Sequence, residues 1–342
     1  MKKVRLGKTE LMVTKTAMGC LPVQRCGVEE GAALIRAAYE GGINFFDTAN
    51  AYTDSEKKIG LALHDVRENV ILATKSASRT REGVLAHIEN SLKMLQTDYI
   101  DLFQFHIVPE VPDFDDPDGY YAGAVEAKER GWIRHIGVTT HRVAVAEELI
   151  ASGKFETLQF PLSYISTDRD IALADKCREA DMGFIAMKGL AGGLLTNTRA
   201  CHAFMKQHEN VVPIWGIQRM SELEQWLATD REDPDMDEEL AAVIRADRQQ
   251  LAGEFCRGCG YCMPCPVGIE INNSARLNML LRRSPWRPFY SPEWREKMER
   301  INDCLECYQC ANKCPYQLDT PKLLKYMLKD WQEFYEEHKA EL

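Results

Sequence analysis

The 342-residue sequence has no apolar run of the roughly 18 residues that a membrane-spanning helix requires. Basic residues are also few, since 42 Lys and Arg stand against 52 Asp and Glu, for a net charge of −10. A protein that binds nucleic acid through its phosphates needs a basic surface. The N-terminal residues lack the apolar core of a signal peptide. We therefore expect a cytoplasmic protein that binds neither membranes nor nucleic acid.

A dinucleotide-binding glycine motif is also missing, because no G-x-G-x-x-G follows the first strand-like segment. Up to about residue 227, strand-like segments alternate with amphipathic ones, one of which places Val84, Leu85, Ile88, Leu92 and Leu95 on one helical face. The eight strand-like segments are 15–19, 43–49, 70–75, 99–106, 133–140, 157–164, 183–188 and 211–217. Eight such units predict a closed parallel (β/α)8 TIM barrel rather than an open doubly wound sheet. The segments VRL and LMV, which flank residues 7–10, predict a short hairpin before the barrel.

The composition changes at the acidic segment 230–239. We predict a barrel over 1–230, an acidic connection with a helix over 231–252, and a small, mostly α-helical ferredoxin-like domain over 253–342. Asp233-Pro234 would open the connecting helix, because proline is favoured in the first helical turn.

Cysteine is abundant in the last part of the chain, where eight of the 12 cysteines form two runs of four, each followed by proline. The runs are Cys256, Cys259, Cys262 and Cys265, and then Cys304, Cys307, Cys310 and Cys314. The second run has the spacing of bacterial ferredoxins, and the first is one residue shorter in its last gap. Structural zinc sites, the alternative, usually pair two separated C-x-x-C knuckles. The spacing therefore predicts two [4Fe–4S] clusters with all eight cysteines as ligands.

In two-cluster ferredoxins, the fourth cysteine of each run serves the other cluster. This crossing would give one cluster Cys256, Cys259, Cys262 and Cys314, and the other Cys304, Cys307, Cys310 and Cys265. The segment between the runs, 266–303, is long and mostly helical in pattern, which resembles the α-helical ferredoxin type.

Four polar residues stand at or just beyond the carboxyl ends of predicted strands: Asp47, Tyr52, Lys75 and His106. In a barrel these ends share the rim that carries the chemistry. Each residue taken singly has a structural alternative, such as a solvated lysine or a buried histidine. Together their roles interlock, because Lys75 would lower the phenol pKa of Tyr52 and Asp47 would hold the ammonium in place. The imidazole of His106 would orient a carbonyl or relay a proton.

The segments FFDTANAYTDSEKKIG, ILATK, FQFH and GVTTH resemble the aldo-keto reductase family, in unbroken order over roughly residues 3–227. In that family, the residues that match Asp47, Tyr52, Lys75 and His106 form the catalytic tetrad. With its cysteine runs, the chain is similar to a ferredoxin-linked subfamily that carries a C-terminal domain with two [4Fe–4S] clusters.

The resemblance implies an NAD(P)H cofactor across the barrel rim. The residues implied to contact it are Gly19, Cys20, Asp47, Thr139, Gln159, Met187 and Arg219. Gln159 matches the family glutamine that holds the carboxamide, and Met187 stands where an aromatic ring often stacks on the nicotinamide.

The segment that would hold the adenosine end, 216–226, departs from the family pattern. Glu222 takes a position that is often Gln or Arg, and Trp226 replaces an asparagine. A carboxylate repels a 2′-phosphate, although Arg219 could compensate. NADPH, NADH and the absence of any dinucleotide therefore all stay open.

Three functions are compatible with these features. The first is an oxidoreductase that interconverts a small-molecule carbonyl and alcohol, coupled to electron transfer through the clusters, with a ferredoxin or flavodoxin as electron partner. The second is a reductase fed single electrons by the clusters without a dinucleotide. The third is an electron-transfer or redox-sensing protein with a non-catalytic barrel. The complete tetrad disfavours the third, because a non-catalytic barrel has no reason to keep it.

Overall fold

The computed structural model describes residues 1–251, 255–283 and 285–341. The chain divides into two compact units. The first consists of Met1–Gly189 and Asn197–Ile244, and the second of Leu190–Thr196 and Arg245–Leu342.

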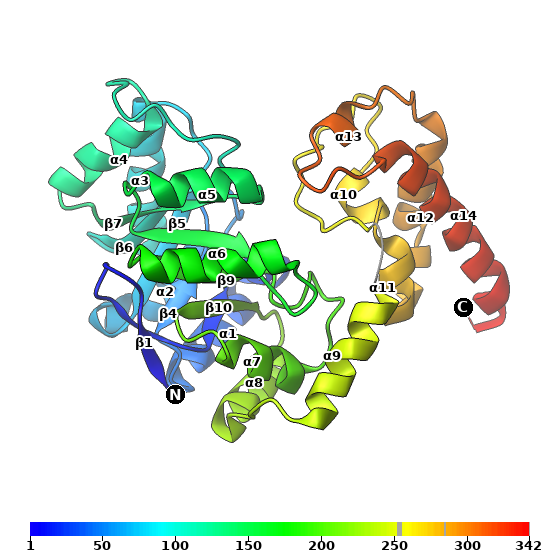
Figure 1. The fold of residues 1–342 in the computed structure, drawn as a ribbon, viewed down its shortest axis with the longest axis horizontal. Coiled ribbons are helices and arrows are strands. Elements are labelled where there is room, and N and C mark those ends of the chain that lie inside the picture. The colour runs from blue at the N-terminus through cyan, green and yellow to red at the C-terminus, as the bar shows by residue number, and fades with distance from the viewer. Residues whose placement is uncertain (252–254, 284, 342) are drawn as a thin grey trace. The chain divides into compact units, whose positions relative to one another are not determined.

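The first unit is a closed barrel of eight parallel strands in the order β10-β3-β4-β5-β6-β7-β8-β9 (Figure 1). The strands are β3 (Ala17–Gly19), β4 (Phe45–Asp47), β5 (Ile71–Ser76), β6 (Ile100–Phe105), β7 (Ile133–Thr139), β8 (Thr157–Pro161), β9 (Gly183–Met187) and β10 (Val211–Gly216). Every strand lies within one of the predicted segments or within one residue of it, so the TIM barrel is confirmed.

A helix follows each strand of the barrel. They are α1 (Val28–Glu40), α2 (Ser55–Leu63), α3 (Arg81–Leu95), α4 (Tyr120–Glu129), α5 (Val143–Ala151), α6 (Asp168–Glu179), α7 (Thr198–Lys206) and α8 (Met220–Glu232). Of the five residues predicted on one face of α3, Val84, Ile88 and Leu95 are buried, whereas Leu85 and Leu92 are half-buried. The helix starts where the Thr80 side chain accepts a hydrogen bond from the N–H of Gly83, which satisfies one of the free donors of the first turn.

The predicted hairpin precedes the barrel and pairs β1 (Lys3–Arg5) with β2 (Met12–Thr14) in antiparallel fashion. Its apolar residues Leu6 and Val13 are fully buried in one cluster with inward residues of the strands, such as Phe45 and Leu102. The hairpin therefore completes the core of the barrel.

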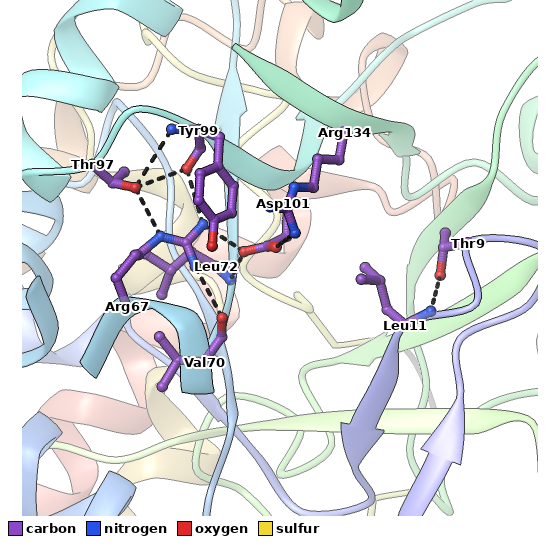
Figure 2. A network of polar contacts seen from close by, with 9 residues as sticks. All are labelled: Thr9, Leu11, Arg67, Val70, Leu72, Thr97, Tyr99, Asp101 and Arg134. Carbon is purple, nitrogen blue, oxygen red and sulfur yellow. Dashed lines mark hydrogen bonds and ion pairs between the residues drawn. The ribbon is translucent and has the colours of Figure 1, made fainter. Parts of the chain in front are cut away.

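A buried ion pair stabilises the amino ends of two neighbouring strands (Figure 2). Arg67 lies in η2 (His64–Asn69), just before β5, and donates to Asp101 at the start of β6 over 2.6 Å. Its other N–H groups donate to the Thr97 hydroxyl and to the carbonyl oxygens of Val70 and Tyr99, each over 2.9 Å. This guanidinium is therefore bound on every side.

The connection after α8 corrects one prediction. Asp233 lies beyond the end of α8 in a left-handed conformation and does not open a helix. Its carboxylate lies 3.1 Å from His202 and 2.9 Å from Lys206, contacts that hold it at the end of α8. The next helix, α9 (Glu238–Gln250), begins after Asp237, whose carboxylate accepts the N–H of Leu240 over 2.8 Å.

The second unit is helical, as expected for the segment between the cysteine runs. Its elements are α10 (Ile271–Ser274), α11 (Leu277–Arg283), η3 (Arg287–Tyr290), α12 (Pro292–Glu299), η4 (Arg300–Asp303), α13 (Gln309–Asn312), α14 (Thr320–His338) and η5 (Lys339–Glu341). The long helix α14 buries Leu324, Met327 and Trp331 against residues of the other helices, such as Leu277 and Tyr290. No helix in the described ranges is long and apolar enough to cross a membrane.

Candidate functional site

Three of the four predicted catalytic residues lie at the carboxyl ends of three neighbouring strands. Asp47 ends β4, Lys75 is next to last in β5, and His106 directly follows β6. Tyr52 lies in the turn between β4 and α2. Because β4, β5 and β6 are parallel neighbours, their carboxyl ends meet at one rim, where the sequence placed them.

Asp47 and Lys75 form a buried ion pair at this rim. The Lys75 ammonium donates to the Asp47 carboxylate and to the carbonyl oxygen of Thr48, each over 2.6 Å. Burial raises the pKa of Asp47 and lowers that of Lys75, and the attraction between the two charges opposes both shifts. Both side chains are almost fully inaccessible, so the pair is fixed in a single arrangement.

Gln104 is a member of this site that the sequence reasoning missed. Its side-chain N–H donates to the second oxygen of Asp47 over 3.1 Å. It lies on β6, whose residues are all buried. A glutamine inside an apolar strand is itself a signal, since a buried amide must find partners. Its amide helps to fix the carboxylate that holds Lys75.

Tyr52 and His106 lie side by side at the rim. Their ring centroids are 5.6 Å apart with an edge-to-face angle of 79°, and the Lys75 nitrogen lies 5.5 Å from the phenol ring centroid. Burial raises the pKa of Tyr52, and the nearby Asp47 and Cys20 raise it further. The expected lowering by Lys75 is therefore wrong for this state, because the Lys75 charge is already compensated by Asp47.

Burial, with the positive charges of Lys75 and Arg79, lowers the pKa of His106 to about 3. The imidazole is therefore neutral at pH 7. A neutral ring has one N–H donor and one acceptor nitrogen, so it is suited to orient a polar group.

Residues predicted to contact a nicotinamide surround the same rim. Gly19 pairs with Asp47 across the neighbouring strands, and the N–H of Cys20 donates to the Asp47 carbonyl over 2.8 Å. The Thr139 hydroxyl accepts the N–H of Ile107 over 2.7 Å and so supports the turn after His106.

Gln159 carries the clearest sign of a missing partner. Its side chain hydrogen-bonds Asp47, yet its own buried oxygen, Oε1, meets no partner within the described part of the chain. A buried acceptor without a donor is costly, and a carboxamide N–H2 group would satisfy it. Met187 ends β9 and is half-buried, near this rim by its place on the strand.

The start of α8, predicted to hold the adenosine end, is occupied by the chain's own side chains. The Glu222 carboxylate accepts the N–H of Gln218 over 2.9 Å. Arg219 is exposed, with its guanidinium 3.8 Å from Glu222. Trp226 is buried and stacks on Trp215, with ring centroids 3.9 Å apart. The site therefore fits the nicotinamide end of a dinucleotide better than a phosphorylated adenosine end.

The cysteine runs of the second unit enclose two cavities. One, of about 360 Å³ including its open mouth, is lined by Cys256, Cys259, Cys262 and Cys314. The other, of about 420 Å³, is lined by Cys265, Cys304, Cys307 and Cys310, and Cys262 also reaches it. Three thiols of one run thus face the fourth of the other run, which is the crossed arrangement inferred from the sequence. Within the described ranges, no three His, Cys, Asp or Glu side chains converge closely enough for a single metal ion.

Two models of protein families match different parts of the chain. Residues 24–234 match the model of the aldo/keto reductase family, and residues 255–319 match that of a 4Fe-4S dicluster domain. Individual proteins and solved structures are also similar to this chain.

The chain is 26% identical over 293 residues to the uncharacterized oxidoreductase YqkF of Bacillus subtilis, covering 81% of this chain and 93% of that protein. Its fold is similar to aldo-keto reductase AKR11C1 from Bacillus halodurans, with a TM-score of 0.61 and 24% identity over 74% of this chain and 97% of that one. It is equally similar to a Klebsiella pneumoniae aldo-keto reductase solved with NADPH, with a TM-score of 0.61 and 21% identity over 72% and 95% of the two chains.

Proposed function

Because this chain belongs to the aldo/keto reductase family, we propose that its barrel interconverts a small-molecule carbonyl and the corresponding alcohol. The observation that carries the proposal is the buried Asp47–Lys75 pair beside the phenol of Tyr52 and the imidazole of His106. A nicotinamide cofactor, when bound, would exchange a hydride with the carbonyl carbon. The side chains of the rim supply the proton and the orientation.

Tyr52 would be the proton donor. Its raised pKa keeps the phenol protonated at neutral pH, and an alkoxide that develops on the substrate is a stronger base than a phenolate. Reverse proton transfer would require the phenolate, which burial and Asp47 disfavour. The site is thus better suited to reduce a carbonyl than to oxidise an alcohol, with His106 orienting the substrate oxygen as a neutral hydrogen-bond partner.

The nicotinamide would be held by Gln159, through its unpartnered oxygen, with Gly19, Cys20, Thr139 and Met187 around the ring. The NADPH complex of the Klebsiella pneumoniae protein supports a dinucleotide in this fold. At the adenosine end, the Glu222 carboxylate disfavours a 2′-phosphate, so we propose NADH as the better ligand, with Arg219, at the start of α8, as a nearby cation.

The two cavities would hold [4Fe–4S] clusters. Each is lined by four thiols, the donor set that a cubane cluster requires, and the matching 4Fe-4S dicluster model supports the same assignment. The clusters would accept or deliver one electron at a time, and a ferredoxin or flavodoxin would be the exchange partner.

A second function is favoured by the start of α8. If Glu222 and Trp226 prevent dinucleotide binding, the clusters could supply electrons singly while Tyr52 supplies protons. This alternative keeps the catalytic role of the rim and changes only the electron source.

Anaerobic turnover separates the two functions. Protein with eight irons is mixed with a panel of aldehydes and ketones and supplied either with NADH or NADPH, or with reduced ferredoxin. Turnover with a dinucleotide alone supports the first function, and turnover with ferredoxin alone supports the second. No turnover with either donor across the panel would contradict both.

A further inference from the structure

Arg276 is a buried cation in the second unit. Its side chain is 8% exposed, in the turn between α10 and α11. Its guanidinium donates to the carbonyl oxygens of Ala191 and Gly192, over 3.1 and 2.8 Å. Within the described residues, no carboxylate contacts it, and its buried Nε has no partner. Arginine stays protonated in proteins, so among the described residues this positive charge lacks the carboxylate partner that a buried charge usually has.

The space around the guanidinium is made by glycine. A Cβ on Gly192 would lie 2.6 Å from the Arg276 nitrogen Nη1, and one on Gly258 would lie 2.8 Å from it. Both glycines have positive φ, of 71° and 63°. The guanidinium therefore packs directly on two stretches of bare backbone, one of them in the first cysteine run.

This placement brings the cation to a cluster ligand. The N–H of Gly258 donates to the Cys256 sulfur over 3.3 Å, and the negative charge of a Cys256 thiolate acts on Arg276. Two arginines of the neighbouring helix α11 have carboxylate partners, Arg282 with Asp330 and Arg283 with Asp247. The counter-charge that suits Arg276 is a set of thiolates around iron.

We propose that Arg276 sets the reduction potential of the cluster bound by Cys256, Cys259, Cys262 and Cys314, making it easier to reduce than it would be without this charge. The inference rests on the cluster sites of the proposed function. On reduction, the cluster takes one electron from an external donor and gains one negative charge, and a buried cation beside it stabilises that state. Burial strengthens the effect, because water screens the charge less. Arg257 lines the first cavity directly, with Arg276 behind it, whereas the described residues that line the second cavity, among them the exposed Cys307, include no lysine or arginine.

The test is an anaerobic redox titration of the full-length protein with dithionite, followed by EPR, in Arg276→Gln and Arg276→Lys. We expect Arg276→Gln to shift one of the two cluster signals to more negative potential, by at least about tenfold in its reduction equilibrium, or about 59 mV for one electron. Arg276→Lys keeps the charge and should stay near the wild type. Arg300→Gln is the matched control, because Arg300 is exposed and already paired with Glu296 over 2.8 Å. It should leave both signals unchanged.

Equal shifts in the Gln and Lys variants, or none in either, would overturn the proposal. If a variant assembles incompletely, its iron content decides. About four irons in Arg276→Gln with about eight in Arg276→Lys would support the need for a charge, whereas loss in both would make Arg276 a packing residue only. The potentials are measured without a carbonyl substrate, so an inactive barrel would not affect this result. Protein that never binds iron in the wild type would instead refute the cluster assignment itself.

Discussion

Two buried ion pairs lie at opposite ends of the barrel strands, and they differ in how completely the polar groups around them are satisfied. At the amino end, Arg67 and Asp101 are surrounded by donors and acceptors, including the N–H of Leu72, which donates to Asp101 over 3.0 Å (Figure 2). At the carboxyl end, Asp47 and Lys75 are just as deeply buried, yet the amides that face them leave two oxygens without a described partner, those of Gln104 and Gln159. An ion pair whose neighbours have all their hydrogen bonds stabilises the fold, whereas an ion pair beside unpartnered amide oxygens is suited to bind a ligand that supplies the missing donors.

The largest expected effect comes from the carboxyl-end pair. Lys75→Met leaves the Asp47 carboxylate buried without its cation and removes the charge beside Tyr52. We expect turnover to fall by about 10²–10⁴-fold, with a loss of about 3–5 kcal/mol in stability from the unpaired charge. Steady-state turnover and the urea midpoint of the same preparation measure both. Because the tetrad acts as one unit, Tyr52→Phe/Lys75→Met should be little slower than Lys75→Met, and full additivity of the two losses would contradict a shared role.

The amino-end pair should behave differently. Arg67→Met removes one partner of a buried pair, and we expect a loss of about 3–5 kcal/mol in stability. Turnover per folded molecule should stay near the wild type, because no rim residue is touched. Arg134→Met is the matched control, since Arg134 is half-exposed and 3.4 Å from the same Asp101, and it should cost about 1 kcal/mol or less. A large fall in turnover at unchanged stability in Arg67→Met would remove the distinction between the two ends.

Much of this contrast follows from the sequence. The eight strands, the hairpin and the shared rim of Asp47, Lys75 and His106 were predicted, because apolar alternation and strand ends determine them locally. Gln104 was not, since its role depends on which residue faces it across β4 and β5. The pKa of Tyr52 was predicted to be lowered, whereas it is raised. The burial of the phenol and the compensation of the Lys75 charge by Asp47 arise only in the packed rim, so the sequence alone did not reveal them. The predicted start of the helix after α8 was also wrong, because the contacts of Asp233 with His202 and Lys206 outweigh the preference of Pro234 for a first helical turn.

The same rim predicts a pH effect on stability. The pKa of His106 is lowered from 6.5 to about 3 in the folded protein, so between these values the unfolded chain binds the proton more readily. Stability from this group is therefore complete above pH 6.5 and is lost as the pH falls. The drop in melting temperature from pH 7.5 to pH 5 should be smaller in His106→Asn than in the wild type. It should not vanish, because His141 is buried with a lowered pKa of the same sign. An identical drop in both proteins would contradict the burial of a neutral His106.

The smallest expected effect lies at the start of α8. Glu222→Gln removes the carboxylate charge that would repel a 2′-phosphate, and two charges at a partly exposed site interact by roughly 0.2–1 kcal/mol. NADPH should then bind about two- to fivefold more tightly, while NADH affinity stays unchanged. Fluorescence titration measures both, and Glu224→Gln, an exposed neighbour, is the control. Equal gains for the two dinucleotides would mean that Glu222 does not discriminate the 2′-phosphate.

The most direct test of the catalytic rim is Tyr52→Phe. The substitution keeps the ring and its packing against His106 and removes the one proton placed to reach a developing alkoxide. Turnover of the carbonyl identified in the substrate panel should fall by about 10²–10⁴-fold, while dinucleotide affinity and iron content stay at wild-type values. Turnover close to the wild type would contradict the account of the carboxyl end as a proton-donating site.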